Sequence, residues 1–86
     1  MELEQIIDVE HRFPRHSNRK SEHLRRMYGV SARRYYYELG RALDDGSMEC
    51  VEPVLAHHLV RLRERRAEAR QERRALRGRD PFLTHF

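Results

Sequence analysis

A glycine turn between two helical patterns is the feature that most constrains the fold of this chain. Leu24 and Tyr28 stand one helical turn apart, so the segment before the turn has an apolar stripe. Gly29 follows directly, and glycine ends helices readily because it adopts the left-handed conformation at little cost. Ser31 can then accept the free amide hydrogens that open a second helix. The sequence therefore predicts two helices joined by a tight turn, the second beginning at about Ala32.

The second predicted helix has two chemically different sides. With about 3.6 residues per turn, one side collects apolar and aromatic residues: Ala32, Tyr35, Tyr36, Leu39, Ala42 and Leu43. The opposite side collects Arg34, Tyr37, Glu38 and Arg41. We expect the first side to pack inward and the second to face outward. In a helix-turn-helix the second helix enters the major groove of DNA, so the outward side is the candidate DNA-contacting surface.

One position departs from the usual helix-turn-helix pattern. That pattern favours a small residue midway along the first helix, where the two helices cross closely, and this chain has Arg25 there. A second interpretation therefore stays open. The two helices would then belong to an ordinary small bundle, with Gly29 as a simple helix end and the arginines solvated.

Composition predicts one small, basic, all-α domain. The chain has 86 residues, of which 38% are hydrophobic and 37% are charged, so the core must be thin and a homodimer is left open. Its single cysteine, Cys50, suits a reducing compartment. No apolar run is long enough for a membrane span or a signal peptide, so we expect a cytoplasmic protein without a membrane partner.

The basic residues form two blocks. Residues 12–43 hold nine bases against two acids, and residues 54–79 hold nine arginines against three acids. Arginine supplies 17 of the 18 basic residues and is suited to bidentate contacts with phosphate or guanine. Such blocks attract polyanions, either double-stranded DNA or an acidic protein surface. The simpler interpretation is that they serve solubility alone.

Proline and helix-capping residues indicate a first helix before the turn. Its pattern covers about residues 2–12 and should end before Pro14, since the residue preceding a proline resists the helical conformation. Residues 14–18 form a loop in which either Ser17 or Asn18 can cap the next helix.

The last predicted helix begins near Pro53, after a turn at residues 44–47. Its start has an apolar stripe, expected to close a four-helix core, formed by Val54, Leu55, Leu59 and Leu62. Farther on, arginines recur along one side as Arg63, Arg66, Arg70, Arg74 and Arg77. The predicted organisation is a helix-turn-helix core over residues 1–62, a protruding basic segment over 63–79 and an apolar tail over 80–86.

A heptad spacing in this helix raises the question of a coiled coil between two copies. Leu55, Leu62, Ala69 and Leu76 recur every seven residues. The alternate core positions would include Arg66 and Arg73, and two arginines in such a seam are unfavourable. A full-length zipper is therefore not expected, whereas dimerisation through residues 54–62 is left open.

Motifs for catalysis or cofactor binding are not found in the sequence. It has no glycine-rich phosphate loop and no nucleophile with an assignable base. Cys50 with His57 and His58 is the nearest approach to a metal set, but adjacent histidines point about 100° apart on a helix. We expect no enzymatic activity, no metal and no cofactor.

Three segments of the chain resemble a known family. They are Ile6–Phe13, the turn and helix start over Tyr28–Tyr36, and Glu52–Arg63. Over residues 6–77 the chain is similar to small actinobacterial proteins, found also in phages of those bacteria, that are catalogued as a domain of unknown function. The resemblance implies a helix-turn-helix fold but transfers no activity. Phe13-Pro14 stands where relatives have a tryptophan pair.

Together these features predict a DNA-binding transcriptional regulator. The helix over residues 32–43 would enter the major groove, and the remaining contacts would go largely to phosphates. The predicted contact residues are Lys20, Arg25, Arg26, Ser31, Arg33, Arg34, Tyr37, Arg41, Arg63, Arg66, Arg70, Arg74 and Arg77. The alternative is a small protein-interaction module, possible for a phage-encoded effector, that binds an acidic surface of a host protein.

Overall fold

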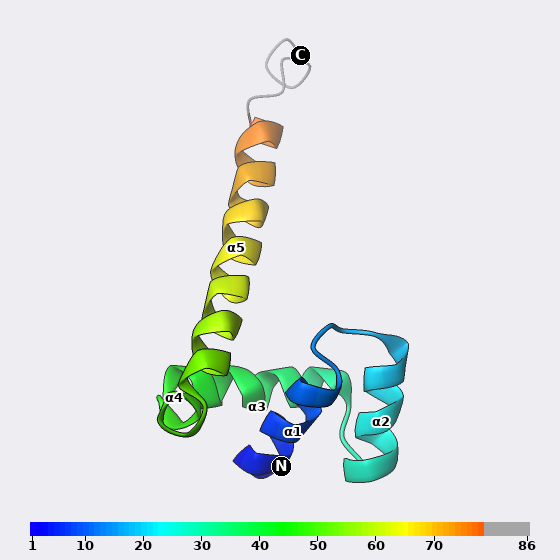
Figure 1. Ribbon diagram of the computed structural model, residues 1–86. Helices are drawn as coiled ribbons and strands as arrows, with labels where there is room; N and C mark the ends of the chain where they lie inside the picture. Colours follow the sequence, from blue (N-terminus) through cyan, green and yellow to red (C-terminus); the bar gives the residue numbers. More distant parts are fainter. Residues whose placement is uncertain (79–86) are drawn as a thin grey trace. The chain divides into compact units, whose positions relative to one another are not determined.

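The computed structural model describes residues 1–78 of the chain, and this part contains five helices (Figure 1). They are α1 (Leu3–Arg12), α2 (Asn18–Tyr28), α3 (Ala32–Asp44), α4 (Ser47–Val51) and α5 (Pro53–Gly78). The predicted all-α class with a long arginine-rich last helix is confirmed. The short helix α4 was not predicted, because its five residues are too few to show a helical period.

The chain divides into two units. The first covers residues 1–56, with α1 to α4 and the first turn of α5, and the second begins at His57. Of the second unit, the structure describes the remainder of α5 up to residue 78. The predicted apolar tail over residues 80–86 lies outside the described residues.

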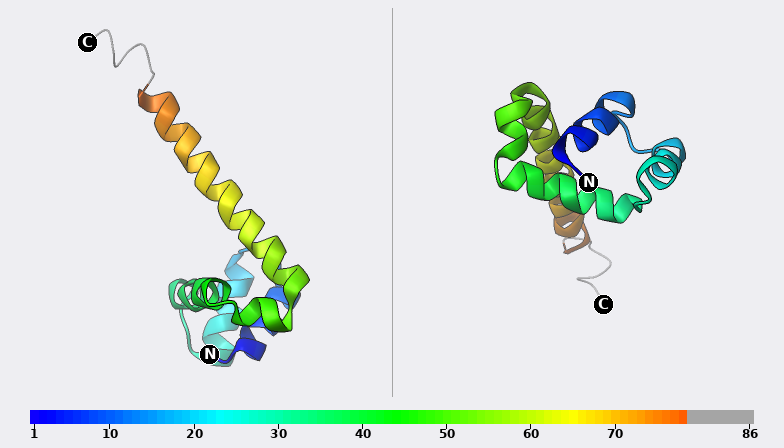
Figure 2. Two further views of the ribbon diagram at one scale, coloured as in Figure 1. Left: turned by 90° about the vertical axis from the view of Figure 1, so that its left-hand side faces the viewer. Right: turned by 90° about the horizontal axis from the view of Figure 1, so that it is seen from below.

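Helix α3 is the central helix of the first unit. It contacts α1, α2 and α4, as the views in Figures 1 and 2 show. Because three helices pack on it, α3 has one side committed to the interior of the unit. Any ligand of α3 must therefore use the side that these helices leave uncovered.

Local interactions explain where the first two helices begin and end. Helix α1 starts after Glu2, whose backbone N–H donates to the side chain of Gln5 at 2.8 Å. It ends before Pro14, as predicted. Helix α2 is capped by Ser17, whose Oγ accepts from the backbone N–H of Lys20 at 3.1 Å. The sequence left Ser17 and Asn18 as alternatives, and the structure selects Ser17.

The apolar core of the first unit draws on all its helices. Its buried members are Ile6, Ile7, Val9, Leu24, Tyr35, Leu39, Ala42, Met48 and Ala56. Met48 is fully buried and explains why α4 forms, since this one side chain ties the short helix to the core. Full burial of a side chain of this size contributes about 1.5–3 kcal/mol, which a helix of one turn needs because it is unstable alone.

Two charged side chains are buried together inside this core. Lys20 is 1% exposed and Glu10 is 4% exposed, and the Lys20 ammonium binds the Glu10 carboxylate. The Tyr35 hydroxyl donates to Glu10 Oε2 at 2.9 Å and lies 3.3 Å from the carbonyl oxygen of Ile6. These contacts join α1, α2 and α3. We call Glu10, Lys20 and Tyr35 the buried triad.

Aromatic rings complete the surroundings of the lysine. Lys20 Nζ lies 5.3 Å from the ring centroid of Tyr35 and 5.1 Å from that of Tyr36. A cation at this distance is attracted by the ring electrons, and the attraction grows when water is excluded. The rings therefore offset part of the cost of burying the ammonium.

Burial raises the pKa of the Tyr35 hydroxyl well above its ordinary value, and the nearby negative charge of Glu10 raises it further. The hydroxyl thus stays protonated in the folded protein and can keep donating to the carboxylate. In the unfolded chain the same hydroxyl ionises at its ordinary pKa. The stability that this difference contributes is present below that ordinary pKa and is lost as the pH rises above it.

Replacing Lys20 alone should strongly destabilise the protein. Lys20→Met leaves the Glu10 carboxylate buried without its cation, which costs about 3–5 kcal/mol of unfolding free energy. Urea denaturation measures the loss. The matched double variant Glu10→Gln/Lys20→Met removes both charges and should recover most of it. Equal losses in the single and double variants would contradict the role given to the ion pair.

Alkaline unfolding should reveal the protonated Tyr35. Above about pH 10, where a free tyrosine ionises, the unfolding free energy of the wild type should fall more steeply with pH than that of Tyr35→Phe. Urea denaturation at several pH values measures both slopes. Tyr37→Phe, which changes an exposed ring, should keep the wild-type slope. Identical slopes in all three proteins would refute the assignment.

Candidate nucleic-acid interface

The turn before α3 has the geometry that the sequence predicts. Gly29 ends α2 with a φ of 64°, in the left-handed region where glycine is favoured, and its N–H donates to the carbonyl of Arg25 at 3.0 Å. Ser31 caps α3, since its Oγ accepts from the backbone N–H of Arg34 at 3.2 Å. Two helices joined by a short glycine turn are thereby confirmed.

The two sides of α3 are also as expected. Tyr35, Leu39 and Ala42 are buried, and Ala32, Tyr36 and Leu43 are partly buried. Three consecutive tyrosines consequently have different environments. Tyr35 is fully buried, Tyr36 is partly exposed with its hydroxyl 3.0 Å from His16 Nδ1, and Tyr37 is 59% exposed.

The outward side of α3 is basic and open to solvent. We call it the basic face and define it by four exposed residues: Arg33, Arg34, Tyr37 and Arg41. Helical periodicity places Tyr37 between Arg33 and Arg41, four residues away on either side. An exposed phenol ring flanked by guanidinium groups can contact both base edges and phosphates.

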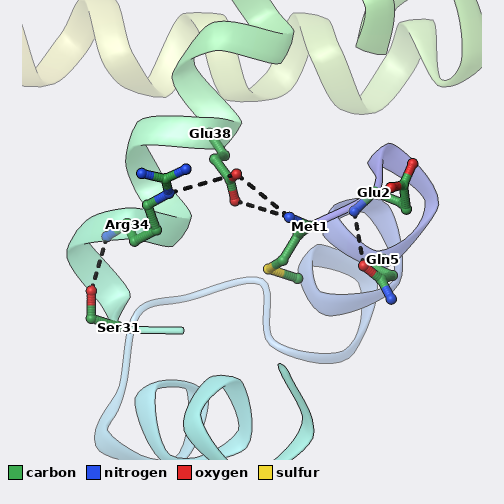
Figure 3. A network of polar contacts seen from close by, with 6 residues as sticks. All are labelled: Met1, Glu2, Gln5, Ser31, Arg34 and Glu38. Carbon is green, nitrogen blue, oxygen red and sulfur yellow. Dashed lines mark hydrogen bonds and ion pairs between the residues drawn. The ribbon is translucent and has the colours of Figure 1, made fainter. Parts of the chain in front are cut away.

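Two acidic residues of α3 lie beside the basic face, Glu38 and the exposed Asp44. Glu38 binds Arg34 Nε at 3.7 Å and the ammonium of Met1 at 3.4 Å, as Figure 3 shows. The Glu38 side chain is only 20% exposed, whereas that of Arg34 remains 65% exposed. The carboxylate is therefore neutralised from two sides, and the arginine that touches it still reaches solvent.

The structure corrects the prediction for Lys20. The sequence analysis placed this residue at the surface as a contact to the DNA backbone, but it lies in the buried triad. Its helical position explains the error, because Lys20 comes one turn before the buried Leu24 on the inward side of α2. A lysine in this position cannot reach a phosphate without opening the core.

The other predicted contacts of α2 are exposed. Arg25 and Arg26 both face solvent, and Arg26 Nη2 lies 3.3 Å from Glu22 Oε1 one turn earlier on the helix. Because Arg25 is exposed, it does not lie between α2 and α3 in the way that its position in the motif suggested. Such exposed ion pairs contribute little to stability, about 0.2–1 kcal/mol, so Arg26 can exchange Glu22 for another anion.

Five further predicted contacts belong to the second unit. They are exposed on one continuous helix, α5, at a spacing of three or four residues: Arg63, Arg66, Arg70, Arg74 and Arg77. Helical periodicity places them along one side of α5. We call them the arginine ridge and treat it as a property of the second unit alone.

Sequence reasoning missed the buried triad as a unit, although a signal for it was present. Glu10 follows the buried Ile6 by one helical turn, and Lys20 precedes Leu24 by one turn, so both charges fall on apolar stripes. Lys20 is also the only lysine among the 18 basic residues. A lone lysine and an acid on facing apolar stripes indicate a buried pair.

Within residues 1–78, no group of three or more histidine, cysteine or acidic side chains is placed to hold a metal ion. Cys50 is exposed as a free thiol. In the same part of the chain, none of the helices has the length and apolarity that crossing a membrane requires.

The chain matches the model of a known family. The model of a family described as protein of unknown function (DUF3263) covers residues 2–71. The chain belongs to this family. The predicted resemblance to a domain of unknown function is thus confirmed at that level. No curated protein and no solved structure matches the chain. Because the family description states no activity, the function must be argued from the site.

Proposed function

We propose that this protein binds double-stranded DNA as a helix-turn-helix transcriptional regulator, with α3 in the major groove. The observation that carries the proposal is the basic face of α3. Its arginines and Tyr37 are exposed, while the opposite side of the same helix is held by the buried core. A helix that is packed against the core on one side and exposes basic residues on the other is suited to insertion into an anionic groove.

The start of α3 also favours an anionic partner. Arg33 and Arg34 lie in its first turn, directly after the Ser31 cap, and Ser31 itself is exposed. The N-terminus of a helix carries partial positive charge and free N–H groups, both of which attract phosphate. Arginine adds bidentate contacts to phosphate or guanine.

In this proposal the contacts divide by position. Arg33, Arg34, Tyr37 and Arg41 contact bases or the adjacent phosphates, Ser31 lies at the groove entrance, and Arg25 and Arg26 contact the flanking backbone. Lys20 is left out because it is buried. The arginine ridge adds non-specific phosphate contacts. A single helix reads few base pairs, so we further propose that two copies bind neighbouring half-sites.

The cellular setting belongs to the same proposal. From the resemblance noted in the sequence, we propose a cytoplasmic protein of actinobacteria or their phages that regulates transcription. The matching family description names neither an organism nor a compartment. The buried triad would keep α3 in one orientation during binding, because it links α3 to both α1 and α2.

Selection from a pool of randomised DNA duplexes tests the proposal directly. The full chain should enrich related sequences, and fluorescence anisotropy with an enriched duplex should show affinity that falls steeply as salt is added. Recovery of no enriched sequence, together with no salt-dependent binding of any duplex, would refute DNA binding.

Removing two arginines of the basic face should weaken that binding. Arg34→Gln/Arg41→Gln deletes two cationic contacts, so affinity should fall by about tenfold or more, and the slope of log affinity against log salt should drop by about 2. The control Arg61→Gln/Arg65→Gln makes the same charge change at exposed positions of α5 on the side opposite the arginine ridge. If both variants lose affinity equally, the basic face has no special role.

A second candidate function rests on exposed apolar side chains. Val51 is 57% exposed and Val54 is 82% exposed, and both lie near the junction of α4 and α5. The expectation that Val54 belongs to the apolar stripe closing the core is therefore wrong. Together with Tyr37 the two valines could anchor a protein contact, since exposed aromatic and apolar groups are common at interface centres. The protein would then bind an acidic surface of another protein through its basic residues.

Affinity capture with nuclease distinguishes the two functions. The full chain is used to capture partners from a nuclease-treated bacterial lysate. Under the first function, capture depends on DNA and is lost after nuclease treatment. A protein that stays bound after nuclease and is released by Val54→Asp would favour the second function and count against the first.

A further inference from the structure

Gly40 lies in the interior of α3, where glycine is unfavourable. The helix runs from Ala32 to Asp44, so Gly40 is more than one turn from either end. Glycine at such a position destabilises a helix relative to alanine, because it loses more backbone freedom on folding. We therefore ask what its missing side chain allows.

Neither backbone geometry nor packing within residues 1–78 requires a glycine at this position. The glycines with positive φ in the described chain are Gly29 and Gly46, so Gly40 has ordinary helical geometry. A Cβ atom placed on Gly40 would meet no heavy atom within 4 Å, other than those of the adjacent residues and the backbone of the helix itself. Alanine would therefore fit in the folded protein without displacing anything.

The position of Gly40 connects it with the basic face. It follows Tyr37 by three residues and is therefore about 60° around the helix axis from it. Arg33 lies between these two directions, and the exposed Asp44 follows Gly40 by one turn. Gly40 is partly exposed, and it borders the basic face on the side away from Arg34. The helix backbone is bare at this border.

We propose that Gly40 is the point where one sugar–phosphate strand of bound DNA passes closest to α3. This inference rests on the proposed function. A helix in the major groove directs its central side chains toward the bases, and its borders lie against the strands that form the groove walls. A residue without a side chain at such a border lets the backbone of a ligand approach closely.

The proposal predicts that stability and binding move in opposite directions at this one position. Gly40→Ala and Gly40→Met both place a good helix former in open space. Alanine should raise the melting temperature by about 2–8 °C, and methionine should not lower it. Affinity for an enriched duplex should fall stepwise with side-chain size, reaching about tenfold for methionine, the loss of roughly one close contact.

Two controls separate groove fit from general charge and from added apolar surface. Heparin is a flexible polyanion that the arginines can bind without a groove, so its affinity should be the same for wild type and both Gly40 variants. Gln71→Met adds the same side chain at an exposed position of α5, and it should leave duplex affinity unchanged. Thermal denaturation and fluorescence anisotropy measure all of these values.

The outcomes separate this inference from the proposed function. A stepwise loss of duplex affinity without loss of stability supports the close approach at Gly40. Unchanged duplex affinity in both variants overturns it and leaves DNA binding in place. A lowered melting temperature, or an equal loss of heparin binding, overturns it as well. If the wild type enriches no duplex, the proposed function fails and this inference falls with it.

Discussion

The buried ion pair between Lys20 and Glu10 is the interaction on which the arrangement of the first three helices depends. Removing either partner would leave a charge without water or counterion, a cost of several kcal/mol, about half the stability of a small domain. Tyr35 completes the arrangement by donating to the same carboxylate oxygen that Lys20 binds. Since each member comes from a different helix, α1, α2 and α3 have one relative placement that satisfies all three groups.

This constraint divides α3 into an anchored side and a free side. The hydroxyl of Tyr35 is held inside by Glu10, the ring of Tyr36 lies near Lys20, and the ring of Tyr37 is in solvent. The rotation of the helix about its axis is thereby set. The arginines that flank Tyr37 owe their common outward direction to the residues on the opposite side of the helix. A functional surface on α3 thus depends on groups that no ligand would touch.

Electrostatics on α3 shows a similar division of roles. Glu38 is one of the two acidic residues beside the basic face, and its contacts with Arg34 and the ammonium of Met1 reduce its repulsion of an incoming anion. Gly40 differs from Glu38, because no contact within the described residues explains why it lacks a side chain.

Local sequence determined the Gly29 turn, the Ser31 cap and the approximate bounds of the four helices that it predicted. Gly29 and Ser31 act through their own backbone and immediate neighbours, so their effects could be predicted without knowledge of the rest of the chain, and so could the inward and outward sides of α3. The burial of Lys20 and the formation of α4 around Met48 could not. Each depends on residues distant in sequence. A lysine can be buried in a core only when a carboxylate is buried beside it, and a helix of one turn is stable only when its side chains pack into a core. The candidate site could therefore be predicted where it is one face of a helix. The prediction was wrong at Lys20, because pairing with Glu10 overrode the usual preference of lysine for water.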